Sequence, residues 1–389
     1  MTTENPRLDI DRIIEDRRTR IIVCCGSGGV GKTTTAAAIG LRAADHGRQV
    51  CVLTVDPARR LAQSMGLTSL DNTPRLVDGV DEESGGSLHA MMLDMKRTFD
   101  EIVEAHADPG RATQILANPF YQSLSSSFAG TQEYMAMEKL GQLRRSDEWD
   151  LIVVDTPPSR SALDFLDAPE RLGRFLDGRL IKVLTAPVKA GRPFGRVINA
   201  GFSVMTGAMT KLLGGQLLRD AQTFITAFDT VFGGFRERAD ATYRLLQAPG
   251  TSFLVIATPE PDALREASYF VERLAEERMP LAGLILNRVH TAGGSQLSAA
   301  RSLAAAETLE TAYPSGEVRA DSPAAYPAAA LTAAALRLHA ERMMLGERER
   351  RVAGSFMSTH PAVPVIEVPA LPEDVHDLAG LRRVGGAFA

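Results

Sequence analysis

A glycine-rich stretch near the start of the chain ends in two residues that could hold a phosphorylated ligand. Residues 24–35 read CCGSGGVGKTTT, and residues 26–33 match the pattern Gly-x-x-x-x-Gly-Lys-Thr. Glycines let such a loop wrap closely around phosphates, with its backbone N–H groups pointing inward. Lys32 would bridge the β- and γ-phosphates of a nucleotide, and the Thr33 hydroxyl would bind Mg²⁺. The residues expected to contact the nucleotide here are Gly28, Gly29, Val30, Gly31, Lys32, Thr33 and Thr34.

Two carboxylates support this site, because each comes at the end of an apolar run that is typical of a strand. Asp56 follows CVLTV, and Asp155 follows LIVV. Ligands bind at the carboxyl ends of parallel strands, so both side chains would face the phosphates. We expect Asp155 to hold Mg²⁺, directly or through water, and Asp56 to orient or deprotonate the attacking water. Lys32 and Asp56 are therefore the candidate catalytic residues, and Thr33 and Asp155 the candidate metal ligands.

Short apolar runs alternate with longer helical patterns through most of the chain, and several of the runs are almost continuously apolar. That pattern is typical of parallel strands that helices cover on both faces. We therefore predict an α/β fold, a doubly wound and mostly parallel sheet of the P-loop NTPase type. The expected strands are residues 20–25, 49–55, 88–93, 151–155, 253–257, 281–286 and 363–368.

The connections between these strands are uneven, and two of them are long and helical. We predict one domain over residues 1–389, with helical insertions at residues 95–147 and 170–249. The second insertion holds four phenylalanines at three- and four-residue spacing, which places them on one face of a helix. An alanine-rich segment near Pro327 predicts a further surface helix. The sheet core is expected in residues 18–94, 148–169 and 250–389, and the phenylalanines are Phe224, Phe228, Phe232 and Phe235.

Composition and charge narrow the class of protein. The 389 residues are 44% hydrophobic and 23% charged, as in ordinary soluble proteins. The net charge of -5 lacks the basic footprint of a nucleic-acid binder, so no nucleic-acid partner is expected. Cys24, Cys25 and Cys51 lie in predicted strands without a Cys-x-x-Cys pair, so no zinc is expected. The polar N-terminus predicts a cytoplasmic protein, and a peripheral place at a membrane stays open.

Several motifs together resemble one known family. GSGGVGKTT, TVDPARRL and WDLIVVDTPPSRSALDFL look like the arsenite-pump ATPases and their relatives that target tail-anchored membrane proteins, which are dimeric ATPases of the deviant Walker A class. LVIATPEPDALREA, LAGLILNRV and VPALPEDVHDL extend the resemblance over nearly the whole chain. The resemblance implies ATP and Mg²⁺ as cofactors. It places Asp56 in a first switch as the water-activating acid, and Asp155 at the start of a second switch that includes Thr156, Pro157 and Pro158.

The resemblance also implies residues for the base and for the dimer. Asn287 would read adenine through its side-chain amide. The loop of residues 369–371, with Pro369 and Leu371, would pack against that base. Glu133, in GTQEYMAMEKL, would lie near the dimer interface.

Three features depart from the family pattern. Ser27 stands where the family carries an extra lysine that reaches across the dimer, and losing a comparable charge in trans costs about 10³ or more in rate. Ser161 stands where a second-switch histidine is usual, with Arg160 just before it. The cysteines that bind metalloid or zinc in the family have no counterpart, so arsenite transport is not expected.

Two hypotheses for function follow. The first is the ATP-hydrolysing subunit of a dimeric, nucleotide-switched ATPase that handles hydrophobic membrane-protein segments, with Met205 and Met209 in its client groove. The alternative is a catalytically weak nucleotide-binding regulatory subunit that pairs with a lysine-bearing paralogue. Whether the dimer is a homodimer or a heterodimer with a related subunit stays open. A chromosome-partitioning ATPase ranks lower, because the ending LAGLRRVGGAFA is too short and glycine-rich for a membrane anchor.

Overall fold

A single β-sheet forms the centre of the described part of the molecule. The computed structural model describes residues 5–55, 59–119, 121–122, 131–157, 235–290, 297–313 and 325–389. Within these residues, eight strands form a sheet in the order β3-β4-β2-β5-β1-β6-β7-β8. All neighbours are parallel except β3 and β4, which pair antiparallel. The strands are β1 (Ile21–Cys25), β2 (Gln49–Thr54), β3 (Arg75–Leu76), β4 (Ser87–Met92), β5 (Leu151–Asp155), β6 (Thr251–Ala257), β7 (Leu281–Val289) and β8 (Val365–Pro369).

The predicted fold, a doubly wound and mostly parallel sheet, is confirmed. All seven predicted strands are present, and their ends differ from the predictions by a few residues. The strand that the sequence did not predict is β3, whose two residues are both exposed and show no apolar run. The central strands β1 and β5 are buried at every position, which explains their continuous apolar character.

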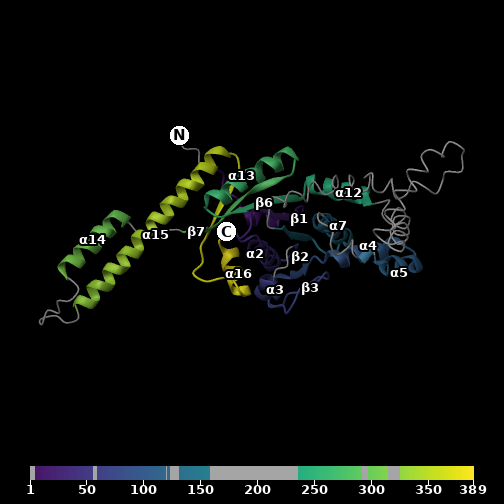
Figure 1. Cartoon of the computed structure of the whole chain (residues 1–389), viewed down its shortest axis with the longest axis horizontal. Coiled ribbons are helices and arrows are strands. Elements are labelled where there is room, and N and C mark those ends of the chain that lie inside the picture. Colours follow the sequence, from purple (N-terminus) through teal and green to yellow (C-terminus); the bar gives the residue numbers. More distant parts are fainter. Residues whose placement is uncertain are drawn as a thin grey trace, which may run out of the picture.

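Helices cover both faces of the sheet. The helices α2 and α16 pack together on one face, and α12 and α13 lie on the opposite face (Figure 1). This division follows from right-handed crossovers, because the chain moves toward β3 after β1 and toward β8 after β6. The described helices are α1 (Ile10–Glu15), α2 (Lys32–Asp45), α3 (Arg59–Ser64), α4 (Met95–His106), α5 (Pro109–Leu116), α7 (Thr131–Ser146), α12 (Phe235–Gln247), α13 (Pro261–Glu276), α14 (Ala299–Ala312), α15 (Ala325–Thr359) and α16 (Leu378–Gly386), with a 3-10 turn at Glu82–Ser84.

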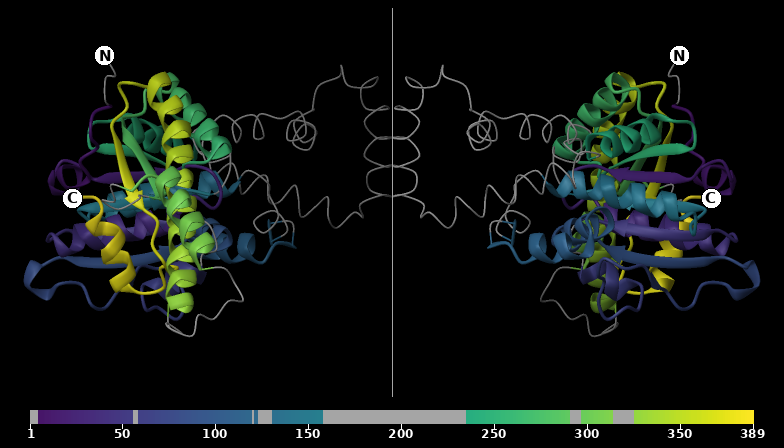
Figure 2. Two further views of the ribbon diagram at one scale, coloured as in Figure 1. Left: turned by 90° about the vertical axis from the view of Figure 1, so that its left-hand side faces the viewer. Right: turned by 90° about the vertical axis from the view of Figure 1, so that its right-hand side faces the viewer.

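The surface helix expected near Pro327 is α15, and it runs for 35 residues. It pairs with α14, which the sequence did not predict, and the two extend away from the strands (Figure 1). Viewed from that side, α15 runs across the layer of strands (Figure 2). A salt bridge joins Arg337 to Glu310 across the two helices, while Leu331 and Leu338 of α15 face solvent.

Most of the second predicted insertion lies outside the described residues, including Phe224, Phe228, Phe232, Met205 and Met209. Its described part is α12, which begins at Phe235. The first predicted insertion, residues 95–147, contains α4, α5 and α7 among its described residues. Of the helices that the structure describes, none is both long and apolar enough to cross a membrane. The final residues are part of the core, since Leu381 and Phe388 are buried at 0% and 1% exposure.

At the amino end of the strands, a buried arginine ties the N-terminal segment to the sheet. Arg48 is 1% exposed and donates to Asp150 Oδ1 at 2.7 Å. It also donates to the carbonyls of Ile14, Thr19 and Asp150 at 2.6–2.8 Å. A buried guanidinium is stable only when its donors are satisfied, and here backbone carbonyls and the Asp150 carboxylate satisfy them.

We predict that Arg48→Met lowers the free energy of unfolding by about 3 kcal/mol, because it leaves these carbonyls buried without a donor. The matched control is Arg17→Met. Arg17 pairs with the same Asp150 but its side chain is 61% exposed, so its loss should cost about 1 kcal/mol or less. Urea unfolding of both variants tests this, and equal losses would contradict it.

Candidate active site

The loop between β1 and α2 is shaped by glycines that tolerate no side chain. A Cβ on Gly26 would lie 2.1 Å from the Ile256 carbonyl oxygen of β6. Gly31 caps α2 with a φ of 93°, in the left-handed region, and a Cβ there would lie 2.3 Å from the Asn287 amide nitrogen. No side chain caps this helix end, so its first N–H groups are available to an anion. Gly28 and Gly29 are exposed, whereas Val30 is buried and Thr34 half-buried.

Lys32, the first residue of α2, folds back across this loop. Lys32 is only 6% exposed, and its Nζ donates to the Ser27 carbonyl at 2.8 Å. The ammonium group is therefore held beside the loop backbone, where a phosphate would need it. Ser27 contributes its carbonyl to this contact.

A buried carboxylate brings three elements together at the start of α2. Asp155, at the end of β5, is 0% exposed. Its Oδ2 accepts from the Thr33 hydroxyl of α2 at 2.7 Å and from the Thr54 hydroxyl of β2 at 2.9 Å. The strand register explains why these groups lie together, because Asp155 of β5 pairs with Cys24 of β1 on one side and with Thr54 of β2 on the other. The structure thus brings the two candidate metal ligands into direct contact.

These groups fit Mg²⁺ as it is bound beside phosphates. Mg²⁺ prefers oxygen ligands and is usually held by one or two carboxylates together with phosphate oxygens and water. The Thr33 hydroxyl and the Asp155 carboxylate supply such oxygens. Among the residues that the structure describes, no group of three or more His, Cys, Asp or Glu side chains could hold an ion. Two protein oxygens leave the other positions around Mg²⁺ to phosphate oxygens and water, so this donor set suits an ion shared with a nucleotide.

Thr156, the residue directly after β5, is attached to β1. The Thr156 hydroxyl and N–H both donate to the Cys24 carbonyl, at 2.9 and 3.2 Å. Beside it, Val55 N–H donates to the Asp155 carbonyl at 3.1 Å, so β2 ends next to Asp155. Asp56, Pro158, Arg160 and Ser161 lie outside the described residues. Glu133 lies in the first turn of α7, where the structure describes the helix and not its side chains.

The ends of β7 and β8 approach the loop from the other side. Asn287 is 8% exposed and donates from Nδ2 to the Val30 carbonyl at 2.8 Å. Val289 pairs with Pro369, and Ala370 N–H donates to the Val289 carbonyl at 3.0 Å. Asn287 and the loop of residues 369–371 therefore lie together, with Leu371 half-buried. The reading of adenine by Asn287 stays a prediction, because its amide here contacts the loop.

Two residues at this site were not among the sequence candidates. Thr54 could have been noticed as the single hydroxyl in the apolar run CVLTV, just before Asp56. Arg288 donates from Nη1 to the Gly29 carbonyl at 3.1 Å. Nothing in the sequence indicates that contact, because it depends on the backbone conformation of Arg288, whose φ is 60°.

The three cysteines lie within the sheet as free, buried thiols. Burial raises the pKa of Cys25 and of Cys51 to about 12. Thiolates are the reactive and metal-binding form of cysteine, so these thiols are inert near neutral pH.

Comparison with known proteins agrees with this geometry. The sequence pattern of the family described as anion-transporting ATPase matches residues 19–313. The chain belongs to the anion-transporting ATPase family. The match includes the phosphate loop, Asp155 and Asn287, and the chain is therefore an ATPase of the P-loop class.

Individual relatives agree with the family. A protein named ATPase get3 from Pyrenophora tritici-repentis is 24% identical over 287 residues, 72% of this chain and 76% of that relative. ATPase GET3 from Malassezia globosa is 28% identical over 198 residues, 51% of this chain and 54% of its own. ATPase ARSA2 from Chlamydomonas reinhardtii is 24% identical over 319 residues, 77% of each. All three are named as ATPases, so the alternative of a catalytically weak regulatory subunit is not favoured.

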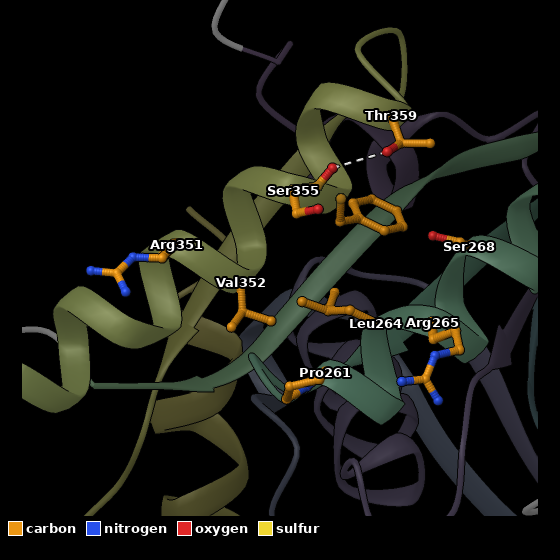
Figure 3. Close-up of a pocket in the computed structure, with 9 residues that line it drawn as sticks. Pro261, Leu264, Arg265, Ser268, Arg351, Val352, Ser355 and Thr359 are labelled. Carbon is orange, nitrogen blue, oxygen red and sulfur yellow. Dashed lines mark hydrogen bonds between the residues drawn. The ribbon is translucent and has the colours of Figure 1, made fainter.

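A separate hollow of about 410 Å³ lies between α13 and α15. Its floor is apolar, with Leu264 and Val352, and Arg265 and Arg351 flank it (Figure 3). It shares no lining residue with the phosphate loop and has no carboxylate, so it is not a candidate for the hydrolytic chemistry. The remaining lining residues are Pro261, Ser268, Ser355, Phe356 and Thr359.

We predict that Thr54→Val raises the Mg²⁺ concentration needed for half-maximal ATP hydrolysis by about 10- to 100-fold, because Asp155 loses a hydrogen bond that orients it. Valine keeps the shape of the buried side chain. The control is Thr251→Val, since Thr251 is also buried and donates to the Leu245 carbonyl at the far end of the sheet. A Mg²⁺ dependence that is unchanged in Thr54→Val would contradict the prediction.

Proposed function

We propose that this chain binds ATP with Mg²⁺ at residues 26–33 and hydrolyses it as one subunit of a dimer whose nucleotide state governs the handling of hydrophobic membrane-protein segments. Binding and hydrolysis of ATP are supported by the contact of Thr33 and Thr54 with the buried Asp155, next to Lys32. Hydroxyl, carboxylate and ammonium groups thus meet at an open helix N-terminus, which is the chemistry a nucleotide phosphate requires.

Each residue of the loop has a role in this proposal. Lys32 exchanges its bond to the Ser27 carbonyl for oxygens of the β- and γ-phosphates. Thr33 and Asp155 hold Mg²⁺, which when bound neutralises charge on the phosphate oxygens. The backbone N–H groups of the loop and of the first turn of α2 face the phosphates. They belong to Gly28, Gly29, Val30, Gly31, Lys32, Thr33 and Thr34.

The attacking water and the adenine of ATP are bound by residues outside the loop. Asp56 follows Val55, which the structure places beside Asp155, and it orients or deprotonates the water in this proposal. Asn287, Pro369 and Leu371 form the base-binding side, which is supported by the pairing of Val289 with Pro369.

Handling of membrane-protein segments is supported by the resemblance to ATPases that target tail-anchored proteins and by the methionines of the second insertion. Unbranched methionine side chains adapt to different apolar partners, as a client groove requires. Met205 and Met209 belong to that groove in this proposal. In this proposal the chain acts in the cytoplasm.

Ser27 determines whether this chain can supply a cation to the phosphates of the opposite subunit. A homodimer of this chain would lack the loop lysine at both sites, whereas a related subunit could supply it to one site. We predict that Ser27→Lys raises the kcat of ATP hydrolysis by the purified chain, by up to about 10³-fold if no other cation serves the site. Steady-state hydrolysis measures this, with Lys32→Ala as the inactive control. A wild type that turns over fast and gains nothing from the lysine would show that Ser27 is no handicap.

The proposed binding of hydrophobic membrane-protein segments has a separate test. We predict that a labelled peptide with a helical apolar segment of about 20 residues binds the purified chain in a nucleotide-dependent manner, because such a length spans a bilayer and needs shielding from water. Anisotropy with ATP, with ADP and without nucleotide measures binding. A peptide of the same length with charged residues inside the segment is the control. Equal binding of both peptides would contradict the client proposal and leave the ATPase proposal untouched.

A further inference from the structure

Strand β7 departs from regular pairing directly after Asn287. Its register against β8 shifts between Asn287 and Val289, so Arg288 is an extra residue in the strand. Arg288 has a φ of 60°, in the left-handed region that residues other than glycine seldom adopt. Its N–H donates to the Asn287 side-chain oxygen at 3.0 Å, which stabilises the kink. Bulges of this kind redirect a side chain and are common beside active sites.

The bulge directs two consecutive side chains onto the phosphate loop. Asn287 donates to the Val30 carbonyl at 2.8 Å, and Arg288 donates to the Gly29 carbonyl at 3.1 Å. The carbonyl of one residue and the N–H of the next belong to one planar trans peptide, and they point in opposite directions. Holding the carbonyls of Gly29 and Val30 toward β7 therefore turns the N–H groups of Val30 and Gly31 away from β7.

We propose that Arg288 is a positioning residue of the phosphate loop. Its guanidinium holds the Gly29 carbonyl outward, so that the Val30 N–H is aligned for a phosphate oxygen before the nucleotide arrives. It also brings a positive charge to a loop whose second position, Ser27, is neutral. This inference rests on the proposed ATP binding and adds a residue to it. Donors aligned in advance need no reorganisation on binding, which is why they contribute strongly to anion recognition.

The proposal concerns phosphates and not the base, and this separates it from other roles. An arginine at the end of β7 could instead stack on adenine, near Asn287 and Pro369. Inorganic triphosphate has no base, so it probes the loop alone. A residue that orients the loop affects both inorganic triphosphate and ATP, whereas a residue that contacts the base affects ATP only.

The experiment uses the full chain with Mg²⁺ and three variants. Arg288→Asn removes the guanidinium while keeping the bulge, because asparagine tolerates the left-handed region. Arg288→Lys keeps a charged donor. Arg278→Asn is the matched control, because Arg278 is also an exposed arginine with a positive φ, 55°, and it lies beyond the end of α13. The measurements are kcat and KM for ATP, the inhibition constant of inorganic triphosphate, and the thermal unfolding midpoint.

We expect Arg288→Asn to raise the inhibition constant of inorganic triphosphate and the KM for ATP together, by about tenfold, as for the loss of a charged hydrogen bond. Arg288→Lys should restore part of that loss. Arg278→Asn should match the wild type, and all unfolding midpoints should agree within a few degrees.

Two results would overturn the inference while leaving ATP binding intact. One is an unchanged inhibition constant for inorganic triphosphate in Arg288→Asn. The other is a rise in the KM for ATP without a rise in the inhibition constant of inorganic triphosphate, which would show that Arg288 contacts the adenine. A wild-type chain that neither binds inorganic triphosphate nor hydrolyses ATP would overturn the proposed function itself.

Discussion

The fully buried carboxylate of Asp155 is the constraint on which the rest of the site depends. A carboxylate withdrawn from water needs donors, and Thr33 and Thr54 supply them from α2 and β2. Both hydroxyls can reach it only if β5 lies between β1 and β2 with the carboxyl ends of all three aligned. The same arrangement sets the start of α2 against the end of β5. The order of the strands therefore determines where Mg²⁺ and the phosphates can lie.

The phosphate loop is held from two sides. On one side, Thr33 connects the start of α2 to Asp155, and on the other, Asn287 and Arg288 bind the carbonyls of Val30 and Gly29. The end of β7 is also connected to α15. The N–H and Nδ1 of His290 both contact the carboxylate of Glu349, which is 7% exposed. One strand end thus contacts both the loop and the α14–α15 pair, which links the nucleotide site physically to the long surface helix.

The anion-transporting ATPase family covers residues 19–313, which include the phosphate loop, Asp155 and Asn287. Ser27 leaves the second position of the loop uncharged, and the cysteines are buried within strands with raised pKa values. After β7 the chain forms α14 and α15, which a salt bridge between Arg337 and Glu310 joins.

The sequence by itself determined the elements whose burial is continuous and local. The apolar runs predicted seven strands, and the motif around Lys32 and the run before Asp155 predicted which strand ends would meet. Only the tertiary structure decided the two-residue strand β3, the burial of Arg48, and the bulge that aims Arg288 at the loop. The physical reason is that hydropathy patterns report the average surroundings of a residue along its own element. A hydrogen bond such as that from Arg288 to Gly29 joins residues far apart in the chain, and its geometry exists only after the strands have paired.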